Sequence, residues 1–115
     1  MRRLEVTLKN IQGKEFELEM YMNINSIKTI EQEVKKIDKN LNYYKALPLI
    51  QKGELTIALI FVTCCLHRKG SKACVGLDWL DNNDIDFFQY SDELMSKLIE
   101  CLEDNKPTVE PKEGK

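Results

Sequence analysis

The sequence lacks the glycine-rich loops with which many proteins hold phosphate groups. It contains neither G-x-x-x-x-G-K-[ST] nor G-x-G-x-x-G. Basic residues occur in pairs, Arg2-Arg3 and Lys35-Lys36, rather than in a stripe interleaved with aromatic residues, and the net charge is −2. No motif therefore supports a nucleotide-dependent activity, and nucleic acid is not expected as the main ligand.

Long apolar runs are also absent. The longest is the twelve residues from Leu55 to Leu66, whereas a helix that spans a membrane needs about 20. The N-terminus leads straight into alternating polar and apolar residues, without the apolar region of a secretory signal. We therefore expect a soluble cytoplasmic protein whose cysteines stay reduced rather than forming a disulfide framework: Cys64, Cys65, Cys74 and Cys101.

The length of 115 residues provides for one hydrophobic core. The sequence predicts a single globular domain over residues 1–105 and a flexible C-terminal tail over residues 106–115, which contain too few apolar residues to order themselves. Charge is uneven, at +4 over residues 1–69 and −7 over residues 70–105. This polarity is compatible with an ordinary solvated acidic face, or with one that orients a partner or a second copy.

Apolar and polar residues alternate over residues 4–9 and again over residues 15–20, with Gly13 in the polar connection between them. This period of two predicts a β-hairpin over residues 1–21 with one apolar face. An isolated hairpin is marginally stable, so helices are expected to cover that face.

The central apolar run fits a strand or a helix by composition, since Ile57, Ile60 and Val62 favour a strand. The fifteen residues from Glu54 to Arg68 are long for a strand and usual for a helix. An acidic start and a basic end also match the helix dipole. We therefore predict a central helix that is buried nearly all round.

The spacing of apolar residues predicts four further helices between residues 22 and 105. The last of them is amphipathic, with Leu94, Met95, Leu98, Ile99 and Leu102 on one face. The predicted fold class is α+β, an N-terminal β-hairpin followed by a small, mainly helical bundle of about four to five helices. The first of the four helices is capped by Asn23 or Asn25 and ends at Lys39-Asn40, and a short second one over 41–47 stops near Pro48. After a loop over 70–82, a short third helix starts at Asn83 or Asp84. The last helix extends from Ser91 or Asp92 to Leu102.

Four candidate zinc ligands fall within eleven residues: Cys64, Cys65, His67 and Cys74. Structural zinc sites usually take two ligands from each of two Cys-x2–4-Cys segments, whereas adjacent residues on a helix point about 100° apart. Cys64 and His67 also have the spacing of a helical thiol–base pair, but the sequence offers no second histidine and no recognisable orienting carboxylate. We therefore predict core cysteines and a helix-terminal histidine, with no metal site and no catalytic residue.

Asn82, Asp84, Asp86 and Glu93 occupy ligand positions of a calcium-binding loop. Phe87 stands where that loop requires glycine, which removes its sharp turn. Helix capping and solvation are the expected roles of these residues.

Aromatic residues gather in the acidic segment. Large rigid rings often anchor protein partners, so these residues are candidates for a protein-binding surface, although they would also serve to cover the hairpin and the last helix. The candidates are Trp79, Phe87, Phe88 and Tyr90.

The order of these parts carries a family resemblance. A hairpin leads into M-N-I-N-S-I-K-T-I-E-Q-E-V (22–34), a leucine-rich run and a loop follow, and the last helix reads S-D-E-L-M-S-K-L-I-E-C-L (91–102). This layout resembles the tail assembly chaperones of long-tailed bacteriophages and prophages over residues 1–105. The resemblance lies in layout and hydrophobic pattern rather than in an invariant motif.

The resemblance implies a non-enzymatic role without a cofactor. Proteins of this family coat the long, helical, aggregation-prone tape-measure protein and help to recruit tail-tube proteins. They act in the cytoplasm of the bacterial host and are absent from the mature virion. A homo-oligomer would be compatible with this role, and a membrane or nucleic-acid partner is not expected. The alternative is a small cytoplasmic regulatory module whose acidic face binds a protein partner.

Overall fold

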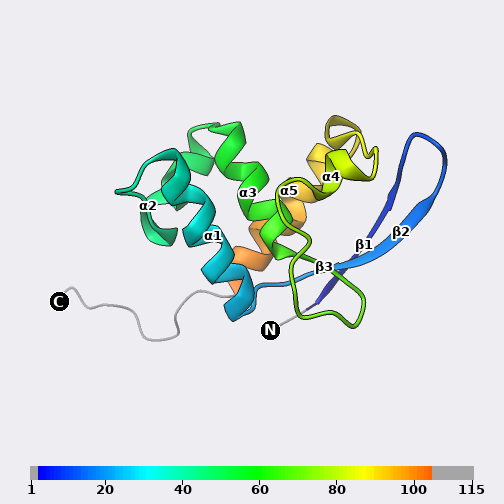
Figure 1. Ribbon diagram of the computed structural model, residues 1–115, viewed down its shortest axis with the longest axis horizontal. Coiled ribbons are helices and arrows are strands. Elements are labelled where there is room, and N and C mark those ends of the chain that lie inside the picture. The colour runs from blue at the N-terminus through cyan, green and yellow to red at the C-terminus, as the bar shows by residue number, and fades with distance from the viewer. Residues whose placement is uncertain (1–2, 105–115) are drawn as a thin grey trace.

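A three-stranded antiparallel sheet and five helices make up the computed structural model, which describes residues 3–104 (Figure 1). The predicted α+β class, a hairpin followed by a mainly helical remainder, is confirmed. The predicted tail over residues 106–115 lies outside the described residues. The elements are β1 (Leu4–Lys9), β2 (Glu15–Met20), α1 (Ile24–Ile37), α2 (Tyr43–Gln51), α3 (Leu55–Cys65), β3 (Leu66–Arg68), α4 (Trp79–Asn82) and α5 (Phe87–Asp104).

The hairpin forms as the alternation predicted. β1 and β2 pair antiparallel, and Val6, Leu8 and Leu18 are buried on the shared apolar face. In the turn, Asn10 Oδ1 accepts a hydrogen bond from the backbone N–H of Gln12 at 3.0 Å. Helix α5 packs against both strands and so helps to cover the face that an isolated hairpin would expose.

A third strand lies where the sequence predicted the end of a helix. β3 pairs antiparallel with β2, with Leu66 opposite Met20, which makes β2 the central strand. The prediction of a helix over 54–68 was therefore wrong for its last three residues, because the chain turns extended at Leu66 (φ −86°, ψ 133°). Pairing with β2 satisfies backbone groups that would otherwise lie open along a sheet edge.

Asn23 caps α1, which resolves the choice between Asn23 and Asn25. Its Oδ1 accepts a hydrogen bond from the backbone N–H of Ser26 at 2.9 Å, and the Asn23 N–H donates to Ser26 Oγ at 3.2 Å. This reciprocal capping box satisfies two donors at the helix start. The helix ends at Ile37, slightly earlier than predicted.

Helix α2 continues through Pro48, so the prediction that it would stop there was wrong. Proline has no N–H, and the carbonyl of Tyr44 therefore loses its usual helical partner. Leu49 and Ile50 nevertheless pack against the core, and the Lys52 N–H donates to the Pro48 carbonyl at 3.2 Å. Packing and these later bonds carry the helix one turn beyond the proline.

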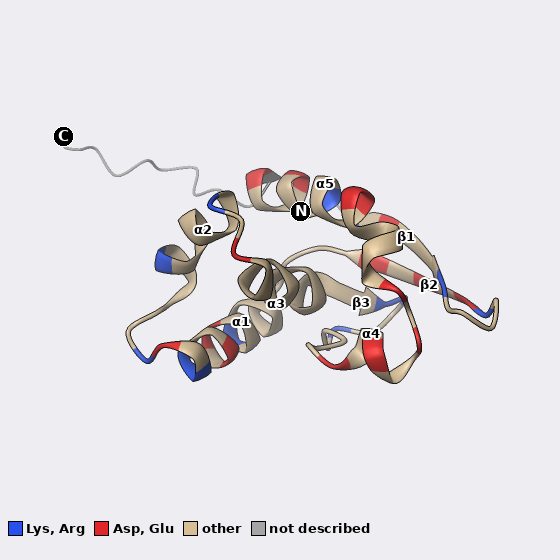
Figure 2. Ribbon diagram, turned by 90° about the horizontal axis from the view of Figure 1, so that it is seen from above, with Lys and Arg blue, Asp and Glu red and all other residues tan. Residues whose placement is uncertain are grey.

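Helix α3 is the buried centre of the molecule, as predicted. Figure 2 shows α1 and α5 on opposite sides of it, and both pack against it. Phe61 and Val62 are fully buried, and the Thr63 hydroxyl is satisfied inside the core by donating to the Leu59 carbonyl at 2.8 Å. The first turn reaches the surface, where Leu55 is exposed, and Leu59 is partly buried.

The last two helices both begin earlier than predicted. α4 forms inside the predicted 70–82 loop, and α5 starts at Phe87 rather than at Ser91 or Asp92. For α5 the cause is Asp86, whose Oδ1 accepts a hydrogen bond from the Phe88 N–H at 3.0 Å and so caps the helix.

Helix α5 also protects the free edge of the sheet. Lys97 Nζ donates to the Glu5 carbonyl at 2.6 Å, and Tyr90 Oη accepts a hydrogen bond from the Lys9 N–H at 2.9 Å. Both contacts occupy backbone groups of β1, which limits the pairing of this edge with another strand.

Among the described residues, no single helix is both long and apolar enough to cross a membrane. Helices α2 and α3 are long and apolar enough for a membrane span only when they are taken together, and the chain bends by 120° between them.

Candidate protein-binding groove

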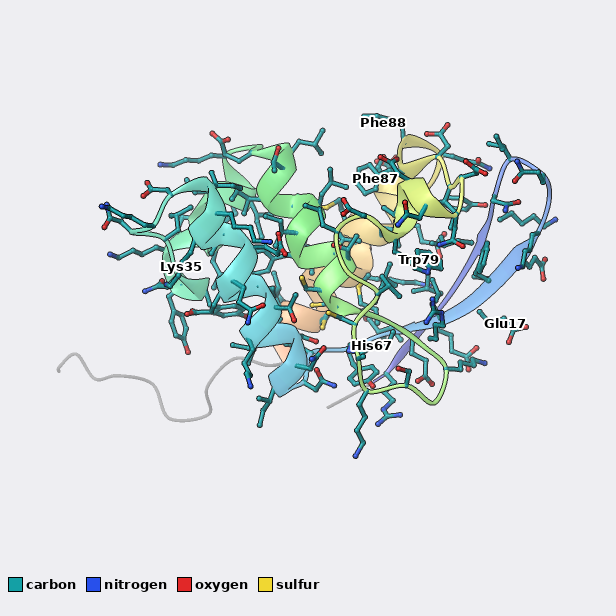
Figure 3. The ribbon with its side chains drawn as sticks, in the orientation of Figure 1. Glu17, Lys35, His67, Trp79, Phe87 and Phe88 are labelled. Carbon is teal, nitrogen blue, oxygen red and sulfur yellow. The ribbon has the colours of Figure 1, made fainter. Side chains whose placement is uncertain are left out.

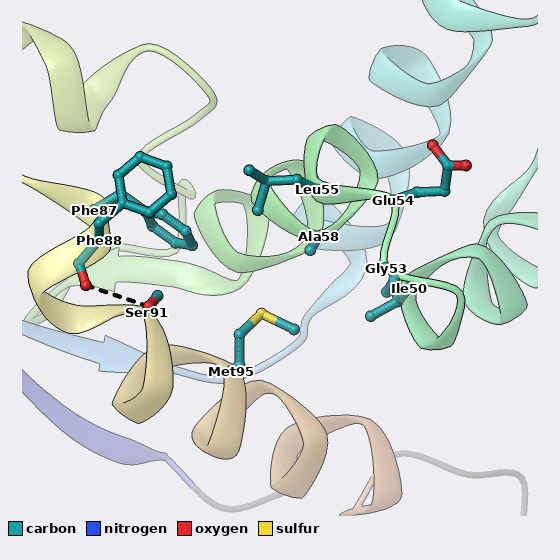
Figure 4. Close-up of a pocket in the computed structure, with 9 residues that line it drawn as sticks. All are labelled: Ile50, Gly53, Glu54, Leu55, Ala58, Phe87, Phe88, Ser91 and Met95. Carbon is teal, nitrogen blue, oxygen red and sulfur yellow. Dashed lines mark hydrogen bonds between the residues drawn. The ribbon is translucent and has the colours of Figure 1, made fainter.

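Two adjoining cavities form an open groove between α5 on one side and α2 with the start of α3 on the other. Their volumes are about 580 and 210 Å³, and Ile50 and Met95 line both. Figure 4 shows the smaller one, in which Met95 extends from α5 toward Ala58 of α3. We call the combined surface the α2–α5 groove. Its lining residues are Tyr43, Tyr44, Leu47, Pro48, Ile50, Gln51, Gly53, Glu54, Leu55, Ala58, Phe87, Phe88, Ser91, Met95, Ile99, Leu102 and Glu103.

One wall of the groove is a stripe along α5. Phe88, Met95, Ile99 and Leu102 are separated by seven, four and three residues, which places them on one face of a helix. Leu94 and Leu98, which the sequence analysis placed on the same face, turn into the core and are fully buried. The apolar arc of α5 is therefore wider than the core requires, and its outer part lines the groove.

The opposite wall is held in place by α1 and by a glycine turn. The Tyr43 N–H donates to Glu31 Oε2 at 2.7 Å, and Lys35 Nζ donates to the Leu41 carbonyl at 2.8 Å. These bonds tie the start of α2 to α1. After α2, Gly53 takes a φ of 86°, a conformation that favours glycine, and α3 begins at the sharp bend.

Exposed apolar side chains concentrate in the groove. Eight large hydrophobic residues are exposed among the described residues, and four of them line it. The four are Tyr44 (67% exposed), Leu55 (47%), Phe88 (73%) and Ile99 (52%). A contiguous apolar surface of this kind marks an interaction site in many soluble proteins.

The side chain of Tyr43, which lines the groove, stays uncharged at neutral pH. Burial raises the pKa of Tyr43 to about 12, with smaller contributions from Cys65, Cys101 and Tyr44. Its ring packs against Phe61 with 5.5 Å between centroids. The groove is thus joined directly to the core of α3.

The four aromatic residues proposed from the sequence lie in different surroundings. Phe87 and Phe88 line the groove, and Figure 3 shows Phe88 projecting from the molecule. Trp79 is buried and meets the ring of Phe16 edge-on, 5.2 Å between centroids. Tyr90 is half-buried and bound to the backbone of β1. The structure brings two of the four to the groove and places the other two beside the hairpin.

Sequence reasoning missed Tyr44 and Ile99 as surface residues of the groove. Ile99 was assigned, with Leu94 and Leu98, to a single apolar face of the last helix, and Tyr44 to a helix with no recognised face. The excess of apolar residues on α5 was a usable signal, whereas the position of α2 depends on contacts with α1 that no local pattern reveals.

The four candidate zinc ligands do not converge on one point, and each has another partner. Among residues 3–104 no three histidine, cysteine, aspartate or glutamate side chains are placed to hold a metal ion together. The thiols instead form two hydrogen-bonded pairs, Cys64 with Cys74 and Cys65 with Cys101.

The candidate calcium ligands are engaged in local contacts. Asp84 Oδ2 accepts a hydrogen bond from Gln12 Nε2 at 3.4 Å, Asp86 caps α5, and Glu93 pairs with Lys97 at 3.1 Å. These are the capping and surface roles that the sequence analysis favoured.

Cys74 is expected to be the most reactive thiol of the folded protein. A hydrogen bond from the Cys64 thiol lowers the pKa of Cys74 to about 6, and the Thr29 hydroxyl contributes further. Hydrogen bonding and burial raise the pKa of both Cys64 and Cys65. Because the thiolate is the nucleophile, iodoacetamide at neutral pH should label Cys74 first, which peptide mass spectrometry would reveal. The variant Cys74→Ser is the control, and faster labelling of Cys64 in the native protein would contradict the assignment.

His67 is a buried structural residue. Its ring stacks on Tyr21 with 4.0 Å between centroids, and Nδ1 lies 3.0 Å from the Cys65 carbonyl oxygen. Its Nε2 lies 3.4 Å from Ser26 Oγ. The histidine therefore joins the end of α3 to the start of α1 and to the residue after β2.

Acidification should destabilise the protein through this histidine. Burial lowers the pKa of His67 in the folded protein below its ordinary value of 6.5. Below about pH 6.5 the histidine of the unfolded chain is therefore protonated while the folded one stays neutral, so unfolding takes up a proton and becomes more favourable as the pH falls. The free energy of unfolding should drop by up to about 1 kcal/mol between pH 6.5 and 5.5 from this group. Urea unfolding of wild type and His67→Gln at pH 7.5 and 5.5 would measure the effect. An equally steep loss in both proteins would show that His67 is not its source.

Comparison of the chain with protein-family models, with curated proteins and with solved structures gave no match.

Proposed function

We propose that this chain is a non-enzymatic protein-binding protein, a tail assembly chaperone of a long-tailed bacteriophage or prophage. Its client would be the tape-measure protein, and recruitment of tail-tube proteins would follow from that complex. The observation that carries the proposal is the α2–α5 groove, an open apolar surface that contains half of the exposed large hydrophobic residues described.

The dimensions of the groove fit a helix. From Phe88 to Leu102 the α5 wall extends for about 21 Å, at 1.5 Å per residue, which matches about four turns of a client helix. Grooves of this type bind the apolar stripe of an amphipathic helix through side chains spaced three, four and seven residues apart. Met95, at the junction of the two cavities, provides a flexible contact that adapts to different side chains.

Co-expression tests this proposal. The tape-measure protein encoded in the same genome should be insoluble when expressed alone, and it should become soluble and co-purify with the full chain. Ile99→Asp, in the groove, should abolish the effect, whereas Ile27→Asp, on the exposed face of α1, should retain it.

Two results would count against it. Failure of the tape-measure protein to co-purify with the wild-type chain would refute the proposed function. Equal activity of Ile99→Asp and Ile27→Asp would show that the groove is not the binding surface.

A further inference from the structure

We infer that the helix bound in the α2–α5 groove is basic along its flanks, with positive residues about eleven positions apart. This inference rests on the proposed function and names the chemistry of the client segment. It follows from the charges that border the groove.

Every charged side chain that lines the groove is a carboxylate. Glu54 lies at the end formed by the start of α3, and Glu103 lies at the other end, near the end of α5. Asp92 belongs to the same border. It lies four residues after Phe88 and three before Met95, and residues at these spacings are neighbours on the surface of a helix. None of the ion pairs found among residues 3–104 involves Glu54, Asp92 or Glu103.

Two of the three neighbouring lysines are directed elsewhere. Lys97, the one basic residue of α5, binds the Glu5 carbonyl and Glu93 on the side of the helix that faces β1. Lys45 lies roughly opposite the groove-lining face of α2, since the helix turns by about 100° per residue. Neither Lys97 nor Lys45 is placed to neutralise the acidic border. Lys52, the third, follows the lining residue Gln51 and lies two residues before Glu54, so the inference depends on Asp92 and Glu103 of α5. None of the ion pairs found among residues 3–104 joins Lys52 to either of these two carboxylates.

The spacing of the carboxylates sets the spacing in the client. Asp92 and Glu103 are eleven residues apart on one helix, or about 16 Å along its axis. A client helix that lies alongside α5 would meet both with lysine or arginine residues about three turns apart. Complementary charge of this kind selects partners and speeds association more than it adds affinity, and it weakens as salt increases.

A second copy of this chain fits the groove less well. Its exposed helix α1 presents Ile24 and Ile27 beside Lys28, but these two apolar residues cover a single turn, whereas the groove extends for about four. Ile37 is also exposed, but the helical spacing turns it away from those two.

Two synthetic helical peptides of four turns test the inference. Both carry the same leucine stripe, and their flanking positions hold lysine in one peptide and glutamate in the other. Fluorescence anisotropy with the full chain at low salt should give at least tenfold tighter binding of the lysine peptide, and added salt should shrink the difference. The double variant Asp92→Lys with Glu103→Lys should reverse the preference.

A matched control changes the same number of charges outside the groove. Asp78→Lys with Asp81→Lys, at the exposed start of α4, should leave the preference for the lysine peptide largely intact. Reversal by this control as strongly as by the groove variant would attribute the selection to net charge and overturn the inference.

The remaining outcomes are distinct from failure of the proposed function. Equal affinity for the two peptides, or binding of neither while the tape-measure protein still co-purifies, would overturn the inference alone. Self-association of the free chain in sedimentation, lost in Ile99→Asp, would assign the groove to a second copy and also overturn it.

Discussion

Replacing Phe61 by alanine should lower the free energy of unfolding by about 3–5 kcal/mol. Phe61 is fully buried near the middle of α3, and its ring packs against Tyr43. Removal of the ring would leave a cavity at the point where α3 meets the wall of the groove. Urea unfolding at neutral pH would measure the loss, which is a large fraction of the stability of a domain of this size.

Leu55→Ala provides the control on the same helix. Leu55 is 47% exposed, so its truncation should cost about 1 kcal/mol or less. Equal losses for the two variants would mean that α3 is not the buried centre described here.

Introducing aspartate at two adjacent positions of α5 should give opposite results. Leu98 is fully buried, and Leu98→Asp would place an unpaired carboxylate in the core, at a cost of about 3 kcal/mol or more. Ile99 is 52% exposed in the groove, so Ile99→Asp should stay folded and lose client binding instead. Circular dichroism and thermal unfolding would separate the two.

This pair tests how α5 divides its apolar residues between core and groove. Unfolding of Ile99→Asp would show that Ile99 supports the core. A stable, well-folded Leu98→Asp would show that α5 is rotated relative to the arrangement described.

The hairpin and the first helix could be predicted because local chemistry determines them. Alternating residues and a polar turn define the strands, and Asn23 with Ser26 defines the start of α1. The central helix was also predictable, since its length and apolar composition leave few alternatives.

The errors arose where distant segments decide the structure. Leu66–Arg68 leave the helix because β2 offers a pairing edge, and the carbonyl of Cys65 receives the N–H of Tyr21. Helix α2 passes Pro48 because the following residues pack on the core. Neither partner is visible in the local sequence.

The groove was only partly predictable for the same reason. Phe87 and Phe88 were identified as exposed aromatic candidates, but the opposing wall depends on Glu31 and Lys35 of α1, which fix the start of α2. A resemblance in element order indicated a protein-binding role without indicating which surface performs it.

Methyl NMR of the isotope-labelled full chain, titrated with a soluble tape-measure fragment, tests the role of the groove most directly. The methyl signals of Ile50, Met95 and Ile99, which line the groove, should shift or broaden. Those of Ile27 and Ile37, exposed on α1, should stay unchanged. Changes confined to Ile27 and Ile37 would contradict client binding in the α2–α5 groove.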